Sequence, residues 1–130
     1  MDNENDLAQT HVNRANTYLN DSQYDMAISE CTKAIQLDPR LYIAYINRAS
    51  AYSMKGQYDQ VVNDCNMAIQ LVPDLPLAYL SRAMAYRSLG RKNEALNDFE
   101  KLITLTNSPQ LIEIAKKHIS ELSQNSDPSV

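Results

Sequence analysis

The sequence has little of what several classes of protein need. With only two glycines, Gly56 and Gly90, in 130 residues, it holds no glycine-rich loop that could cradle a phosphate, which disfavours a nucleotide enzyme. Its 12 basic residues form no run and are outnumbered by 16 acidic ones, so neither nucleic acid nor an anionic membrane is an expected partner. No apolar run approaches the roughly 20 residues of a membrane helix, and the first residues, MDNENDL, are acidic where a signal peptide is basic and then apolar. We therefore expect a cytoplasmic protein.

What the sequence does contain is a repeat. The string VNRANTY at residues 12–18 returns as INRASAY at 46–52 and LSRAMAY at 80–86, each time 34 residues later. A second string, AISECTKAIQLDP at 27–39, returns as VVNDCNMAIQLVP at 61–73 and more loosely as ALNDFEKLITLTN at 95–107. With 44% hydrophobic and 22% charged residues, the chain has the composition of one globular domain.

Each 34-residue unit is predicted to hold two helices. Its apolar residues recur with helical spacing, and the breaks between helices fall at NDSQ (20–23), KGQ (55–57) and LGR (89–91), while Pro39 and Pro73 end the second helix of the first two units. This pattern predicts seven helices near residues 7–20, 24–37, 41–55, 58–71, 75–89, 92–106 and 109–123.

The residues with the greatest chemical reactivity carry no recognisable site. Cys31 and Cys65 lie one repeat period apart, so we expect them about 8–10 Å from each other, beyond the roughly 7 Å between Cα atoms that a disulfide allows. Both are expected to be buried free thiols rather than a bridge or a metal pair. The histidines, His11 and His118, have no nucleophile or carboxylate placed beside them by a motif. We predict no enzymatic activity, no cofactor and no metal.

The repeated residues resemble those of the tetratricopeptide repeat family, whose pattern is W-x2-L-G-x2-Y, A-x3-F and P over 34 residues. The matching residues are His11, Arg14, Ala15, Tyr18, Ala27, Cys31 and Pro39 in the first unit; Tyr45, Arg48, Ala49, Tyr52, Val61, Cys65 and Pro73 in the second; and Tyr79, Arg82, Ala83, Tyr86, Ala95 and Phe99 in the third. The resemblance implies an all-α, right-handed α-solenoid of three helical hairpins plus a C-terminal capping helix. Its repeats would span 8–41, 42–75 and 76–109 within a single domain of residues 8–123, flanked by a flexible segment 1–7 and a disordered tail 124–130.

Two features of the units have a structural interpretation. An acid follows each recurring arginine by sixteen residues, which predicts the intra-repeat ion pairs Arg14–Glu30, Arg48–Asp64 and Arg82–Asp98. Residues 109–123 are amphipathic, with Ser108 placed as N-cap and Pro109 at the first helical position. We expect this helix to cover the apolar end of the third unit, as the last element of a solenoid must.

The resemblance also implies a partner site. In the family, the first helices of successive repeats line a concave groove that holds a peptide. The residues of this sequence that would line that groove are Val12, Asn13, Asn16, Ile43, Ile46, Asn47, Ser50, Leu77, Leu80, Ser81, Met84 and Arg87, and the same helices also offer Gln9, Asn20, Met54 and Ser88. Apolar side chains away from a helix's packing stripe indicate a contact surface. The alternative is that, in the narrow groove of a three-repeat protein, some of them pack on the neighbouring helix.

Three functions are compatible with these residues. The first is an adaptor whose groove binds a neutral or apolar segment of another protein. The second is a structural protein that stacks end to end through its first helix, where no polar cap precedes the first unit. The third is chaperone-tail binding, for which a subclass of the family uses two asparagines and several basic residues. Asn16 and Asn47 are present here, but Val12, Leu77 and Ser81 stand at the basic positions, so this function is the least expected.

Overall fold

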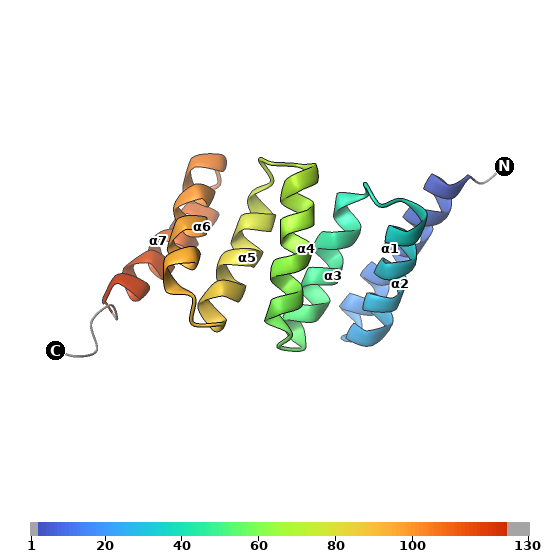
Figure 1. Cartoon of the computed structure of the whole chain (residues 1–130), viewed down its shortest axis with the longest axis horizontal. Coiled ribbons are helices and arrows are strands. Elements are labelled where there is room, and N and C mark those ends of the chain that lie inside the picture. The colour runs from blue at the N-terminus through green and yellow to red at the C-terminus, as the bar shows by residue number, and fades with distance from the viewer. Residues whose placement is uncertain (1–2, 125–130) are drawn as a thin grey trace.

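A computed structural model describes residues 3–124, and this part of the chain forms seven helices and no strands (Figure 1). They are α1 (Glu4–Asn20), α2 (Tyr24–Leu37), α3 (Tyr42–Met54), α4 (Tyr58–Leu71), α5 (Pro76–Ser88), α6 (Lys92–Leu105) and α7 (Pro109–Gln124). The helices follow one another along the long axis of the molecule, with the two termini at opposite ends. The predicted helical repeat fold is therefore confirmed, as are the helices' number and order within the described residues.

The turn inside each hairpin repeats the same backbone conformation. Gly56 and Gly90 have φ values of 74° and 76°, in the left-handed region that favours glycine, while Ser22 takes a φ of 59° at the equivalent place in the first hairpin. In each turn, the backbone amide of the residue after this left-handed residue donates to the carbonyl five residues before it, as Gln57 does to Tyr52 at 2.9 Å. The sequence positions LGR and KGQ are thus helix-ending turns, as predicted.

The first helix begins earlier than predicted. Residues 4–7 are helical rather than part of a flexible segment, because the Asn3 side chain caps the helix by accepting from the Asp6 amide at 2.9 Å. Glu4 and Asp6 also place negative charge at the positive end of the helix dipole. Residues 1–2 and 125–130 lie outside the described part of the chain, and the predicted disordered tail falls there except for Gln124, which ends α7.

Small side chains allow the hairpins to stack closely. Ala44 and Ala51 on α3 and their counterparts Ala78 and Ala85 on α5 are at most 2% exposed, where each helix meets the preceding hairpin. Cys31 and Cys65 are free and fully buried in the same stack. The largest wholly buried side chains are those of Phe99 and Leu102, on α6.

The outer face of α1 is polar, and this corrects one sequence-based expectation. Thr10 and Thr17 occupy the places that Ala44 and Ala51 hold one period later, and both are exposed. Their hydroxyls donate to the Asp6 and Asn13 carbonyls at 3.0 and 3.3 Å. The expectation that the first unit lacks a polar cap is wrong, because α1 itself carries polar groups where a preceding hairpin would otherwise pack.

Helix α7 covers the other end of the stack. Ser108 caps it by accepting from the Leu111 amide at 3.3 Å, and Ala115 and Leu122 are buried against α6. One period after Tyr79 and Ala83 of α5, the chain has Glu113 and Lys117, both exposed. Helix α7 is thus the first helix of an incomplete fourth unit, with charged residues on the face that a following helix would cover.

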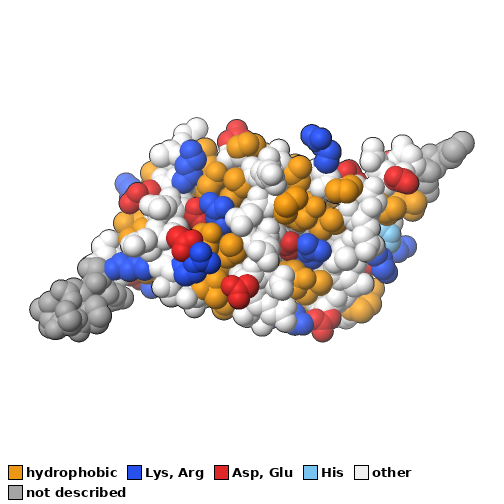
Figure 2. Space-filling view, viewed as in Figure 1, with side chains coloured by type: hydrophobic (Ala, Val, Ile, Leu, Met, Phe, Trp, Pro, Cys, Tyr) orange, Lys and Arg blue, Asp and Glu red, His pale blue; other side chains and the backbone are white. Residues whose placement is uncertain are grey.

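The first helix of each hairpin lies on the inner side of the stack. Helix α3 contacts both α1 and α5, whereas α4 has no comparable contact with α2 or α6. Because α1, α3 and α5 are closer together, they form the concave side of the described solenoid. The view of Figure 2, in which α2, α4 and α6 lie towards the viewer, shows acidic, basic and apolar side chains interspersed among the described residues.

Candidate functional site: the concave surface

Buried ion pairs fix the first helices of the second and third hairpins. Arg48 donates to Asp64 through Nε at 2.9 Å and Nη2 at 2.7 Å, and Arg82 donates to Asp98 through the same two atoms at 2.7 Å each. Both predicted pairs are confirmed. In each case Nη1 reaches back to the preceding hairpin, from Arg48 to Thr32 at 3.2 Å and from Arg82 to Asn66 at 2.8 Å. Each arginine therefore joins two hairpins as well as the two helices of its own.

The first hairpin departs from this arrangement. The Arg14 side chain is 61% exposed, and its Nη1 lies 4.0 Å from Glu30, at the limit of an ion pair. Glu30 is instead approached by His11, whose Nδ1 lies 3.2 Å from its Oε2. The predicted Arg14–Glu30 pair is present but long, and its arginine is exposed because α1 packs only against α2 and α3 in the described structure. His11 also replaces the tyrosines that elsewhere donate to a proline carbonyl, as Tyr45 does to Pro39 at 3.1 Å.

Among the described residues, the cysteines offer no reactive thiolate, and the His, Cys and acidic side chains form no metal site. Burial raises the pKa of the Cys31 and Cys65 thiols to about 12, so neither is a thiolate nucleophile near neutral pH. Within residues 3–124 no three His, Cys, Asp or Glu side chains are placed to hold a metal ion. No helix in this range is long and apolar enough to cross a membrane.

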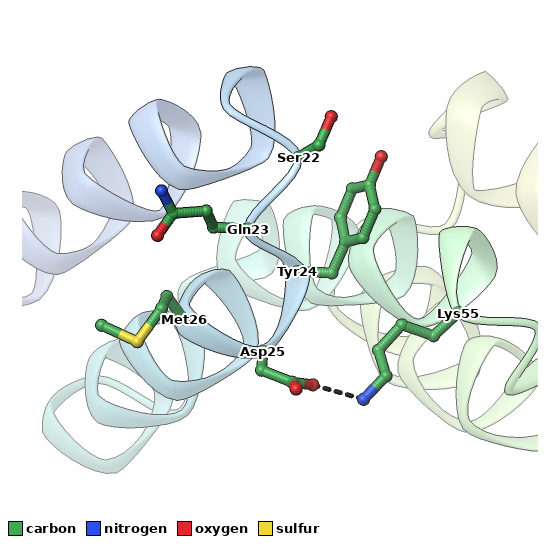
Figure 3. A pocket seen from close by; sticks show the side chains of 6 residues that line it. All are labelled: Ser22, Gln23, Tyr24, Asp25, Met26 and Lys55. Carbon is green, nitrogen blue, oxygen red and sulfur yellow. Dashed lines mark hydrogen bonds and ion pairs between the residues drawn. The ribbon is translucent and has the colours of Figure 1, made fainter.

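A shallow hollow beside the first turn is a product of the repeat. Ser22, Gln23, Tyr24, Asp25 and Met26 line it with Lys55, whose ammonium is paired with Asp25 (Figure 3). A second hollow has the equivalent lining one period later: Gly56, Gln57, Tyr58, Asp59, Gln60 and Leu89. Because the same hollow forms wherever a hairpin turn lies beside the end of the next first helix, it carries no argument for a specific ligand.

The concave surface holds a hollow of a different kind, between α3 and α5. Its volume is about 320 Å³, and it is lined by Ala49, Ser50, Ser53, Met54, Leu80, Ser81 and Met84. Five of these, Ser50, Met54, Leu80, Ser81 and Met84, were predicted from the sequence as groove residues. Met54 is 64% exposed and Met84 39%, so two flexible apolar side chains stand open to solvent at this place.

The N-terminal half of the concave surface is polar. Asn47 on α3 donates through Nδ2 to Oδ1 of Asn16 on α1 at 2.8 Å. Asn13, one turn earlier on α1, accepts from Gln9 at 3.1 Å. The amide pair retains acceptor and donor capacity beyond this single bond, since each side-chain amide has two N–H groups and an oxygen with two lone pairs.

Two of the predicted contact residues lie in the core. Val12 is 1% exposed and packs with Ala8, Ala34 and Ala44, and Ile46 is 8% exposed against Ala68 and Ala78. The prediction that they line the groove is wrong, because at this helical position the side chain turns towards the next hairpin. Ile43 is partly buried for the same reason, whereas Leu77 remains 51% exposed.

Helix α7 contributes to the C-terminal end of the concave surface, which the sequence-based prediction missed. Arg87 of α5 donates through Nη1 to Glu121 of α7 at 2.8 Å, and the same nitrogen contacts Nδ1 of His118. The His118 ring stacks on Phe99, with centroids 4.8 Å apart and planes 6° from parallel. A signal was present in the sequence, since Glu121 follows Arg87 by one 34-residue period. Ser53, in the hollow, was missed as well.

A solenoid of helical hairpins with an open concave face defines the chain as a repeat protein of the protein-interaction class. Tetratricopeptide repeat models match residues 8–41 and 77–109, and a further one matches residues 30–62. The chain belongs to the tetratricopeptide repeat family, and it is a protein–protein interaction module. No curated protein sequence matches it significantly.

Solved structures agree with this assignment. The first TPR domain of human RPAP3 is 30% identical, with a TM-score of 0.86 over 95% of this chain and 98% of that one. The first TPR of Spaghetti (RPAP3), bound to the HSP90 peptide SRMEEVD, is 29% identical, with a TM-score of 0.85 over 92% and 95%. The Arabidopsis OM64 TPR domain is 26% identical, with a TM-score of 0.86 over 91% and 98%.

Proposed function

We propose that the concave surface binds an uncharged, apolar segment of another protein. The observation that carries this proposal is the hollow between α3 and α5, where Met54 and Met84 are exposed beside Leu80. Exposed apolar side chains gathered in a depression gain free energy when a partner covers them, at about 25 cal/mol for each Å² of apolar surface removed from water. Methionine adapts its shape to the partner because its side chain is unbranched and flexible.

The polar half of the surface fits the backbone of such a segment. Asn16 and Asn47 are held against each other at 2.8 Å, so their amides are ordered before a partner arrives. An asparagine amide can donate to a peptide carbonyl and accept from a peptide N–H at once. In this proposal the asparagines hold the main chain, and the methionine-lined hollow takes an aliphatic side chain.

A chaperone tail is a weaker candidate, although the Spaghetti (RPAP3) domain binds the acidic peptide SRMEEVD. At the positions where the tail-binding subclass has basic residues, this chain has Val12, Leu77 and Ser81, and Val12 is buried. Without those cations, the carboxylates of an acidic tail would lose hydration and gain no ion pair.

End-to-end self-assembly is also a weaker candidate, because both ends of the described stack are polar. Thr10 and Thr17 make the outer face of α1 polar, and Glu113 and Lys117 do the same for α7. An isologous or head-to-tail contact through these ends would bury polar groups without an evident partner for them. Light scattering over a range of concentrations separates the two functions, since assembly predicts growing oligomers and the adaptor predicts a constant mass.

We also propose that this protein acts in the cytoplasm. Its partner in this proposal is another protein rather than a nucleic acid. The excess of 16 acidic over 12 basic residues supports the exclusion of nucleic acid, and so does the mixture of both charges on the face that Figure 2 shows. The two free, buried thiols support a reducing compartment.

The experiment is a selection of binding peptides from a random library, followed by affinity measurements with variants of the chain. We expect the selected peptides to be uncharged and to contain aliphatic residues. Leu80→Asp should weaken their binding at least tenfold, and Asn47→Ala should weaken it less, with helical content and melting temperature intact. Unchanged binding by both variants would place the site elsewhere on the molecule.

A further inference from the structure

An ion pair between α5, the first helix of the third hairpin, and the capping helix α7 lies at the C-terminal end of the concave surface. Arg87 lies one turn beyond Met84 on α5, and its Nη1 donates to Oε1 of Glu121 on α7 at 2.8 Å. The Arg87 and Glu121 side chains are 30% and 40% exposed, so the pair lies at the surface and not in the core. His118 contacts the same guanidinium nitrogen from the adjacent turn of α7.

The Arg87–Glu121 pair determines whether the predicted groove lining carries a net charge. Among the twelve residues predicted to line the groove, Arg87 is the only one with a charge at neutral pH. The hydrogen bond from Arg87 lowers the pKa of Glu121, which is therefore ionised near neutral pH. The charges of Arg87 and Glu121 cancel, so the predicted lining together with Glu121 carries no net charge.

We propose that Glu121 is a specificity-determining residue that masks Arg87 and so makes the concave surface reject acidic segments. An incoming carboxylate must displace a carboxylate that is already tethered beside the guanidinium, and a tethered group competes at a high effective concentration. A glutamate that is not displaced repels the incoming charge instead. This inference rests on the proposed function, because it concerns the partner of the same surface.

A purely structural role for the pair makes a different prediction. If the bond only anchors α7 to α5, loss of the Glu121 charge should lower stability and leave the preference among peptides unchanged. If Glu121 masks Arg87, its replacement should increase the affinity for acidic peptides specifically. The ratio of acidic to neutral affinity is therefore the informative readout, and a merely structural role would not move it.

The test compares Glu121→Gln with Glu113→Gln, an exposed position on the outer face of the same helix. Both changes remove one negative charge, but only the first is next to Arg87. The probes are the acidic peptide acetyl-SAMEEVD, in which alanine replaces the arginine of SRMEEVD, and its uncharged counterpart acetyl-SAMQQVN with an amidated C-terminus, measured by fluorescence anisotropy. We expect Glu121→Gln to bind the acidic peptide about two- to fivefold more tightly than the wild type does, the range of a partly exposed ion pair. The uncharged peptide should be unaffected.

Two further measurements identify Arg87 as the source of the gain. The double variant Arg87→Gln/Glu121→Gln should lose it, and so should the single variant in 1 M salt, where the screening length is about 3 Å. An equal gain in Glu113→Gln, or no gain in Glu121→Gln, would overturn the inference. Binding of the uncharged peptides selected from the library tests the proposed function separately, because it does not depend on Glu121.

Discussion

The first hairpin and the two that follow it share one sequence motif but not one structure. Arg48 and Arg82 are enclosed and bonded to their acids, whereas Arg14 is 61% exposed. The difference lies outside the motif, because the third hydrogen bond of each enclosed arginine goes to the preceding hairpin, at Thr32 or Asn66. A repeat therefore acquires its full set of interactions only from a neighbour on its N-terminal side.

The two ends of the described stack are capped in different ways. Helix α1 replaces the contact alanines with threonines that bond to their own helix, so its end needs no cover. The third hairpin keeps an apolar outer side, and Phe99 and Leu102 are fully buried there with α7 packed against their helix. The N-terminal end is therefore capped by polar substitutions within α1, and the C-terminal end by the added helix α7.

Removing the added helix should have the largest effect. A chain ending at Ser108 uncovers the apolar outer side of α6, at a cost of about 1.5–3 kcal/mol for each large side chain exposed. We expect aggregation or a large fall in melting temperature, measured by light scattering and thermal denaturation. A chain ending at Gln124 is the control. A monomer with an unchanged melting temperature after truncation at Ser108 would show that α7 is not a cap.

Replacement of the recurring arginine tests the comparison within the hairpins. Arg48→Met leaves the buried Asp64 carboxylate without its partner and should lower the free energy of unfolding by roughly 2–3 kcal/mol. Arg14→Met removes a mostly exposed charge and should change it by less than about 0.5 kcal/mol. Urea denaturation measures both. Equal losses in the two variants would mean that enclosure by the preceding hairpin does not matter.

The turn residue offers a smaller and cleaner test. Ser22 has a φ of 59°, where Gly56 has 74° in an equivalent turn. Ser22→Gly should raise the free energy of unfolding by about 0.5–1 kcal/mol, because glycine enters this region without the steric cost of a Cβ. Gly56→Ser should have the opposite effect, since a Cβ there meets no atom within 4 Å and only the backbone cost remains. Destabilisation by Ser22→Gly, or stabilisation by Gly56→Ser, in thermal denaturation would contradict the turn assignment.

The smallest expected effect concerns pH at the C-terminal end. Burial lowers the pKa of His118, and the nearby Arg87 lowers it further, while Glu121 opposes them. Above the unfolded value of about 6.5 both states hold a neutral ring, and below it the unfolded chain takes up the proton more readily, so stability falls as pH falls. The drop in melting temperature between pH 7.5 and 5 should be smaller in His118→Gln. An identical drop would exclude His118 as its source.

The sequence predicted the fold closely because the 34-residue repeat determines where the helices and turns lie. Three copies in register locate the helices, the turns at Gly56 and Gly90 and the pairs of Arg48 and Arg82. The errors have a common cause: periodicity gives the face of a helix but not its neighbours. Val12 was assigned to the groove although α3 covers it, and the Arg14–Glu30 pair was expected to match the other two although its arginine is 61% exposed. Glu121 was missed because it lies beyond the last complete copy of the motif.

The most direct test of the central claim uses two methionines with nearly equal exposure. Met84 on the concave surface is 39% exposed, and Met67 on α4 is 38% exposed. Each is changed to aspartate, and the affinity for a selected uncharged peptide is measured by titration calorimetry. The account predicts that Met84→Asp weakens binding at least tenfold while Met67→Asp leaves it unchanged. Equal affinities for the two variants, or a loss confined to Met67→Asp, would contradict a binding site on the concave surface.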